Sequence, residues 1–148
     1  MMRPSWDKYW MEIVMAVRKR ATCNRGQTAC VITRDNQILA TGYVGSIIGA
    51  PHCDDVGHWL IDGSCIRTLH AEANAIAQCA KLGIAIKDAT LYCFLFPCLP
   101  CTKLIIQSGI IRVVSEFDYQ KAELSKKFLE TAGVEWTINR PQEYAYIN

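Results

Sequence analysis

The sequence predicts an α/β fold with one mixed β-sheet and helices on both of its faces. Two observations predict this class. The first third of the chain has a helix followed by a hairpin, whose two strands must pair antiparallel. The rest alternates helix and strand, the order from which parallel sheets are built. A chain of 148 residues suits one core, and no repeat or linker divides it, so we expect a single domain over 1–148.

The first half begins with an expected helix at 5–20, because Ser5 is a good N-cap and basic residues gather at the far end. A hairpin follows, with strands at 29–34 and 37–44 around an Asp-Asn turn. Residues 45–66 show little periodicity and predict a loop. Loops of that length in a small domain are usually functional or tied down by something.

The second half opens with a helix expected at 69–82, capped by Thr68 and ended by Gly83. This helix is apolar almost all round, which predicts that it is buried. A near-continuous apolar run at 89–96 predicts a strand covered on both faces. The remaining expected elements are a helix at 101–108, a strand at 110–115, a helix at 121–132 and a strand at 134–138.

The composition is that of a globular protein, with 51% hydrophobic and 20% charged residues. The net charge of +2 argues against a nucleic-acid partner, and the one basic run, at 18–20, fits the solvated end of a helix. No apolar stretch is long enough to span a membrane, and the first residues lack a secretory h-region. We therefore expect a cytoplasmic protein whose eight cysteines are reduced, which favours metal binding or catalysis over disulfides.

Two short motifs, His-Ala-Glu at 70–72 and Pro-Cys-Leu-Pro-Cys at 97–101, lie at the starts of two expected helices. Helices that follow adjacent strands of a parallel sheet begin at the same edge, so His70, Cys98 and Cys101 can meet there. One imidazole and two thiolates, with a fourth position for water, form the ligand set of a catalytic zinc. By itself, the Cys-x-x-Cys pair is equally typical of a disulfide or a redox dithiol.

Glu72 can share a cavity with His70 only at the first turn of a helix, where it would approach the zinc-bound water without binding the metal. That position suits a general acid/base. His-x-Glu followed by Pro-Cys-x-x-Cys is identified as the signature of zinc nucleobase deaminases. In that chemistry, Glu72 delivers a proton to N3 of a cytosine ring, C4 is attacked by hydroxide, and ammonia leaves.

From about Trp6 to Val134, the chain resembles the deoxycytidylate (dCMP) deaminase family. The resembling segments are TCNR (22–25), TGYVGS (41–46), residues 52–83, FPCLPCTKLIIQSGI (96–110) and FDY (117–119). The resemblance implies an α/β/α sandwich around a five-stranded mixed sheet. It implies a hydrolase acting on a C–N bond, which converts dCMP to dUMP for thymidylate synthesis. It also implies a homohexamer that dCTP with Mg²⁺ activates and dTTP inhibits.

The resemblance places part of the effector site at Gly42, Tyr43, Val44 and Gly45. Val44 stands where the family usually has Asn, which removes an amide able to bond an effector nucleotide. The alternative is that this segment is a plain turn at the end of a strand.

A second group of potential ligands lies outside the catalytic motifs: Cys23, Cys53, His58 and Cys65. Three cysteines and a histidine form a closed set of the kind that structural zinc prefers, and a metal there would explain how the long loop stays ordered. His52 is an alternative to His58, and buried or free thiols are the alternative to a metal. Cys30, Cys79 and Cys93 lie in apolar segments and are interpreted as core residues.

Substrate contacts are expected from Asn24 and Arg25, because an arginine fork matches two phosphate oxygens at once. The resemblance implies that Tyr119 stacks on the pyrimidine, and that Ala71 contacts the substrate. A solvated Arg25 and a Tyr119 at the edge of the core are the alternatives. Asn74, polar within an apolar helix, is expected to brace the backbone near the site.

Two rival functions remain on the sequence alone. One is a deaminase acting on tRNA adenosine or single-stranded DNA, which shares the zinc chemistry but is disfavoured by the low net charge. The other is a non-catalytic zinc protein that senses nucleotides, for which an acid/base at Glu72 would have no use.

Overall fold

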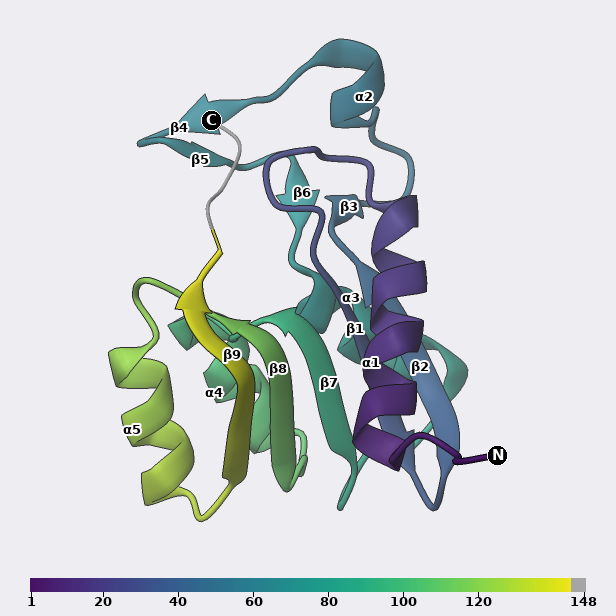
Figure 1. The fold of residues 1–148 in the computed structure, drawn as a ribbon. Coiled ribbons are helices and arrows are strands. Elements are labelled where there is room, and N and C mark those ends of the chain that lie inside the picture. Colours follow the sequence, from purple (N-terminus) through teal and green to yellow (C-terminus); the bar gives the residue numbers. More distant parts are fainter. Residues whose placement is uncertain (145–148) are drawn as a thin grey trace.

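The computed structural model describes residues 1–144 and confirms the α/β class, with helices on both faces of a mixed sheet (Figure 1). Within that range the central sheet has five strands in the order β2-β1-β7-β8-β9. Their bounds are β1 Ala29–Arg34, β2 Gln37–Tyr43, β7 Thr90–Leu95, β8 Arg112–Asp118 and β9 Glu135–Glu143.

The strand directions determine where the helices begin. Strand β1 is antiparallel to both of its neighbours, β2 and β7, whereas β7, β8 and β9 are parallel. Consequently β2 runs in the same direction as β7, and both end at the same edge of the sheet. Our expectation that adjacent strands lead into the two motif-bearing helices was wrong, because β1 lies between β2 and β7. The predicted meeting at one edge does not depend on adjacency.

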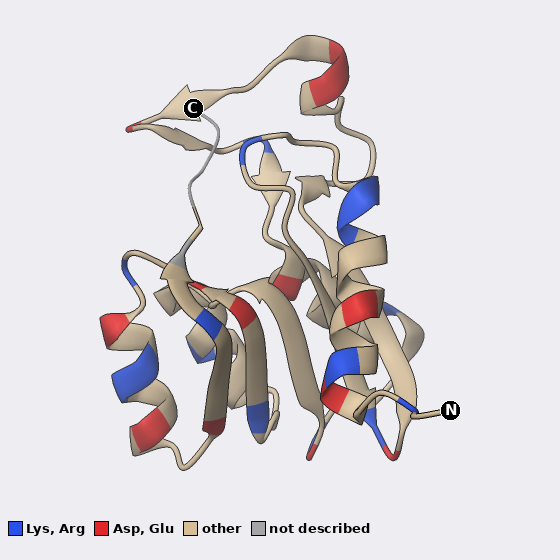
Figure 2. Ribbon diagram, viewed as in Figure 1, with Lys and Arg blue, Asp and Glu red and all other residues tan. Residues whose placement is uncertain are grey.

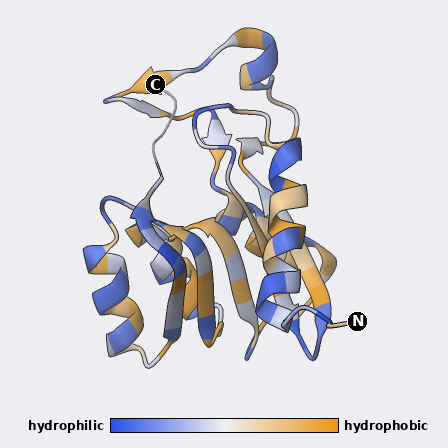
Figure 3. Ribbon diagram, in the orientation of Figure 1, coloured by the Kyte–Doolittle hydropathy of each residue, from blue (hydrophilic) through white to orange (hydrophobic). Residues whose placement is uncertain are grey.

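Four longer helices cover the sheet unequally. Helix α1 (Trp6–Val17) packs on one face, where its Trp10 and Val14 belong to the same buried apolar cluster as Val31 and Phe94. The opposite face carries α3 (Ala71–Leu82), α4 (Leu99–Gln107) and α5 (Glu123–Thr131). Apolar residues concentrate on β7 and β8, between these two layers (Figure 3).

Acidic and basic residues are interspersed along α1 and α5, as Figure 2 shows. None of the helices in residues 1–144 combines the length and apolar character that crossing a bilayer requires.

The helix starts differ from the sequence prediction in an informative way. The N-cap of α3 is His70, not Thr68, which pairs instead in the short strand β6 (Thr68–Leu69). The N-cap of α4 is Cys98, three residues before the expected start. The expected cap of α1 is confirmed, since the Ser5 hydroxyl accepts a hydrogen bond from the Lys8 backbone N–H at 3.2 Å.

The expected loop at 45–66 contains short elements rather than none. Strand β3 (Gly45–Ser46) pairs with β6 and closes the neck of an insert, which we define as residues 47–67. The insert holds α2 (Cys53–Val56) and a hairpin of β4 (Leu60–Ile61) and β5 (Ser64–Cys65), and it projects beyond the sheet (Figure 1). These elements were invisible to periodicity because each spans only two to four residues.

Gly42, near the end of β2, lies directly against the first turn of α3. An ideal Cβ placed on Gly42 would be 2.3 Å from the Ala71 carbonyl oxygen and 2.7 Å from the Ala75 backbone nitrogen. Both are backbone atoms, which cannot move aside independently of the helix. The absence of a side chain at Gly42 therefore fixes how closely α3 approaches the sheet.

We predict that Gly42→Ala lowers the free energy of unfolding by about 1–3 kcal/mol, because overpacking forces α3 outward. Urea denaturation at a fixed protein concentration measures the loss. Gly45→Ala is the matched control. Its added Cβ would meet Thr22 Oγ1 at 3.1 Å and the Tyr43 ring at 3.3 Å, and both are side-chain atoms that can shift. Equal stability of the two variants would contradict the role given to Gly42.

Candidate active site and metal clusters

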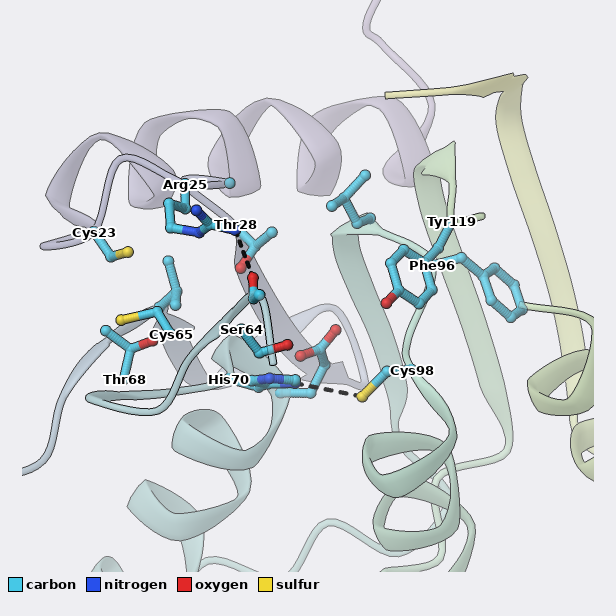
Figure 4. Close-up of a pocket in the computed structure, with 15 residues that line it drawn as sticks. Cys23, Arg25, Thr28, Ser64, Cys65, Thr68, His70, Phe96, Cys98 and Tyr119 are labelled. Carbon is cyan, nitrogen blue, oxygen red and sulfur yellow. Dashed lines mark hydrogen bonds between the residues drawn. The ribbon is translucent and has the colours of Figure 1, made fainter. Parts of the chain in front are cut away.

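A cavity of about 310 Å³ opens at the edge of the sheet where β2 and β7 end. That volume lies at the small end of the range for small-molecule sites, roughly 300–1,000 Å³. Its walls come from the segment after α1, the end of β2, the insert with β6, the starts of α3 and α4, and the ends of β7 and β8. Figure 4 shows His70 and Cys98 on its floor, with Tyr119 on one side and Arg25 on the other.

The first ligand cluster consists of His70, Cys98 and Cys101, as the sequence predicted. His70 Nδ1 lies 3.4 Å from the sulfur of Cys98 and 3.4 Å from the sulfur of Cys101. A tetrahedral zinc with bonds of about 2.3 Å to sulfur and about 2.0 Å to nitrogen separates these atoms by about 3.5 Å. The three side chains therefore fit zinc, and two of them, His70 and Cys98, line the cavity.

The positions of these ligands follow from helix capping. His70 and Cys98 have extended backbone conformations as N-caps of α3 and α4, and Cys101 lies in the first turn of α4. The partial positive charge of a helix start favours a thiolate there. The pKa of Cys98 is lowered to about 4, because the Cys101 thiol and then the His70 ring hydrogen-bond to its sulfur. This lowered pKa favours the thiolate form of Cys98, which is the form that binds a metal.

Glu72 is buried, with 7% of its surface exposed, yet it lines the same cavity as His70. Burial raises the pKa of its carboxyl, and this outweighs the opposing effects of its own backbone N–H and the charge of His70. The extended conformation of His70 brings side chains two residues apart into one space. The sequence predicted this arrangement at a first turn.

The second cluster consists of Cys23, Cys53, His58 and Cys65, whose ligand atoms all lie within 4.8 Å of one another. Cys23 Sγ is 3.5 Å from His58 Nδ1, and the sulfurs of Cys53 and Cys65 are 3.6 Å apart. Tetrahedral zinc predicts about 3.5 Å and about 3.8 Å for these separations. Four ligands fill a tetrahedral coordination sphere and leave no place for a substrate.

The surroundings of the second cluster also suit a metal. His58 Nε2 lies 3.1 Å from Asn24 Oδ1, the type of partner that orients a ligating imidazole. Burial raises the pKa of Cys65, but the backbone N–H groups of Arg67 and Trp59 outweigh it, and the pKa falls to about 6. The alternative ligand His52 is the exposed N-cap of α2 and does not belong to the cluster.

The structure separates the predicted substrate contacts. Arg25 and Tyr119 line the cavity. Asn24 does not line it and instead pairs with His58. Ala71 is fully buried and is also absent from the cavity wall. The sequence analysis missed Thr28, Ser64, Thr68, Leu95 and Phe96, which do line it.

Two polar contacts hold the start of α3 in place. The Asn74 side-chain amide donates to the Tyr43 carbonyl at 3.1 Å, as expected for a bracing residue. The Cys30 thiol donates to the Ala71 carbonyl at 3.3 Å, which the sequence gave no reason to expect. Cys30, Cys79 and Cys93 are buried in the core, as predicted.

Residues 4–116 match the model of the cytidine and deoxycytidylate deaminase zinc-binding region. The chain is 42% identical over 134 residues to ComE operon protein 2 of Bacillus subtilis, covering 90% of this chain and 71% of that protein. It is 37% identical over 142 residues to the deoxycytidylate deaminase of Saccharomyces cerevisiae, again over 90% of this chain. The chain spans only 45% of the length of the yeast protein.

The fold is similar to that of the dCMP deaminase of cyanophage S-TIM5, solved in complex with dCMP and dUMP. The TM-score is 0.81 and the sequence identity 28%, over 93% of this chain and 99% of the phage chain.

We predict that the purified protein carries two zinc ions per chain and that Cys53→Ser carries one. The substitution removes one of the four ligands of the second cluster, so zinc binding there is expected to be lost. The first cluster shares no residue with the second and is expected to keep its zinc. Inductively coupled plasma mass spectrometry measures the ratio of zinc to protein. Cys79→Ala, a core cysteine in neither cluster, is the control and is expected to keep both ions. One zinc per chain in the wild type, unchanged by Cys53→Ser, would contradict a second metal site.

Proposed function

The chain belongs to the cytidine and deoxycytidylate deaminase family, and from this premise we propose that it hydrolyses dCMP to dUMP and ammonia. One observation carries the proposal: a zinc-type ligand set and a buried carboxyl share a cavity with a guanidinium and a tyrosine. The Glu72 carboxyl is suited to transferring a proton to a pyrimidine ring, and the Arg25 guanidinium is suited to binding a phosphate. The named relatives and the dCMP-bound phage enzyme support the same substrate.

The proposed roles of the residues follow from their positions. When bound by His70, Cys98 and Cys101, zinc lowers the pKa of a water molecule, so that a nucleophile is available near neutral pH. Glu72 accepts a proton from the attacking water as the water oxygen bonds to C4, and donates that proton to N3 of the pyrimidine. The same carboxylate then takes the remaining proton from the new C4 hydroxyl group and passes it to the 4-amino group, so that the C4–N bond breaks, ammonia leaves and the C4 carbonyl forms. Its burial favours the protonated form, which is the form that donates.

The other cavity residues orient the nucleotide in this proposal. Tyr119 packs against the pyrimidine ring from the end of β8, and Arg25 holds the 5′-phosphate at the other end of the cavity. Asn24 acts through His58 rather than on the substrate. Ala71 does not contact the substrate in this proposal. It is the first residue of α3 and lies between His70 and Glu72, so its backbone sets the spacing of these two side chains.

An ammonia-release assay on dCMP, CMP, dCTP and deoxycytidine tests the proposal, with dCMP expected to be the preferred substrate. Glu72→Gln is expected to lower kcat by roughly 10²- to 10⁴-fold while zinc remains bound, because it removes the acid/base but no ligand. Glu130→Gln, on the exposed side of α5, is the control. Turnover of a cytosine oligonucleotide but not of dCMP would establish the nucleic-acid rival. Zinc binding without turnover of any cytosine nucleotide would establish the sensor.

We further propose a cytoplasmic role in supplying dUMP for thymidylate synthesis and assembly into homohexamers. Both rest on the family resemblance.

Regulation by dCTP with Mg²⁺ and by dTTP is proposed at the segment of Gly42, Tyr43, Val44 and Gly45. The Val44 backbone is fixed there, since its N–H donates to the Thr28 carbonyl and its carbonyl accepts from the Thr22 N–H. Val44 also lines the cavity, so in this proposal an effector bound at the segment changes the wall of the active site.

We predict that dTTP inhibits dCMP turnover and that Val44→Asn increases this inhibition, because it adds an amide able to bond a nucleotide. The measurement is the dTTP concentration that halves the rate, with and without dCTP and Mg²⁺. Val44→Leu, which changes size without adding a hydrogen-bonding group, is the control. Identical dTTP sensitivity of the three proteins would remove this segment from the effector site.

A further inference from the structure

Arg25 is held in the cavity wall by the tip of the insert hairpin. Its Nη2 donates to the Gly63 carbonyl oxygen at 2.8 Å, across 38 positions of sequence (Figure 4). Asp62 and Gly63 both have positive φ angles, 49° and 78°, which form the tight turn that exposes this carbonyl. The contact joins the segment after α1 to the insert.

Both partners of this contact lie two residues from a ligand of the second cluster. Cys23 precedes Arg25, and Cys65 follows Gly63. In Figure 4 the two sulfurs face each other at the same end of the cavity as Arg25. A metal bound by Cys23 and Cys65 therefore fixes both backbones at the base of the contact.

The hairpin has few other means of support. Each of its strands has two residues, and Leu60, Ile61 and Ser64 are all exposed. A two-stranded hairpin without a buried face is at best marginally stable in water. The position of the Gly63 carbonyl thus depends on the cluster rather than on hydrophobic burial.

Arg25 is the only lysine or arginine among the residues that line the cavity in the described chain. It is accordingly the one fixed cation in that wall for a phosphate dianion. The Gly63 carbonyl accepts from one of the five N–H donors of the Arg25 guanidinium, which leaves other donors for phosphate oxygens. The proposed catalytic groups come from α3 and α4 and include no residue of the hairpin.

We infer that the cluster of Cys23, Cys53, His58 and Cys65, by fixing the Arg25–Gly63 contact, gives the cavity its preference for a nucleoside monophosphate over the unphosphorylated nucleoside. The inference rests on the proposed function for its substrate. Cys53, His58 and Gly63 are in this view positioning residues that act through Arg25. The metal of the second cluster serves recognition of the phosphate, and the first cluster serves the reaction.

The test compares Cys53→Ser, Arg25→Gln and the double variant on dCMP and on deoxycytidine. Cys53 is the suitable ligand to change because, unlike Cys23 and Cys65, it does not line the cavity. Both single variants are expected to lower kcat/KM for dCMP by roughly 10- to 100-fold, mainly through KM, as for a lost hydrogen bond to a charged group. Deoxycytidine turnover is expected to change less than about threefold. The double variant should be no worse than Arg25→Gln.

Calorimetric titration provides a readout that needs no turnover. Binding of dUMP is expected to weaken in Cys53→Ser by the same factor as KM, and binding of deoxyuridine to stay unchanged. Arg20→Gln, exposed and outside the cavity wall, and Cys79→Ala are the matched controls. Circular dichroism and one remaining zinc per chain show that the variant is folded.

Three outcomes overturn the inference. Cys53→Ser weakens dUMP and deoxyuridine binding equally, or affects neither, or its effect on dCMP adds fully to that of Arg25→Gln. Failure of the proposed function is distinguishable from these outcomes. It appears as no ammonia from dCMP with the wild-type protein, while the dUMP and deoxyuridine titrations still measure the preference for phosphate.

Discussion

The common direction of β2 and β7 is the constraint on which the proposed chemistry depends. Both strands end at one edge of the sheet, and the pairing of β3 with β6 returns the chain from the insert to that edge. Helices α3 and α4 therefore begin there, and their N-caps are His70 and Cys98. A metal held at two helix starts has ligands anchored to backbone that the sheet fixes. The close approach allowed by Gly42 and the hydrogen bonds of Cys30 and Asn74 hold one of these starts in place. A small movement of α3 would therefore displace His70 and Glu72 together.

The sequence predicted which segments form the strands of the mixed sheet, and which residues form the first ligand cluster, because both have strong local patterns. His-x-Glu and Pro-Cys-x-x-Cys each occupy a helix start, and the apolar runs mark the buried strands. It misplaced the starts of α3 and α4 for a related reason: the capping residues are the ligands, which are poor caps by propensity. The end of β9 was also missed. The strand was expected at 134–138 but continues to Glu143 through a register shift beside Asp118.

Other features have no local signal at all. The elements of the insert are too short to show periodicity. Their positions depend on the second ligand cluster, which combines a residue before β1 in the sequence with three residues after β2. Asn24 and Arg25 are neighbours in sequence, and both were expected to contact the substrate. Only the fold shows that Asn24 turns to His58 while Arg25 turns to the cavity and Gly63. Such a division of roles between adjacent residues follows from tertiary contacts that residue type does not encode.

The paired neck of the insert has an evolutionary consequence. Gly45 pairs with Leu69 and Ser46 with Thr68, so the chain leaves the domain and returns to it at nearly the same point. Residues between such closely spaced ends can be lengthened, shortened or exchanged at little cost in loop-closure entropy and without moving the sheet. Selection can thus alter the part of the cavity wall that the insert supplies while the residues at the starts of α3 and α4 stay as they are. One ancestral hydrolytic centre can in this way give rise to descendants that differ in the molecules they admit.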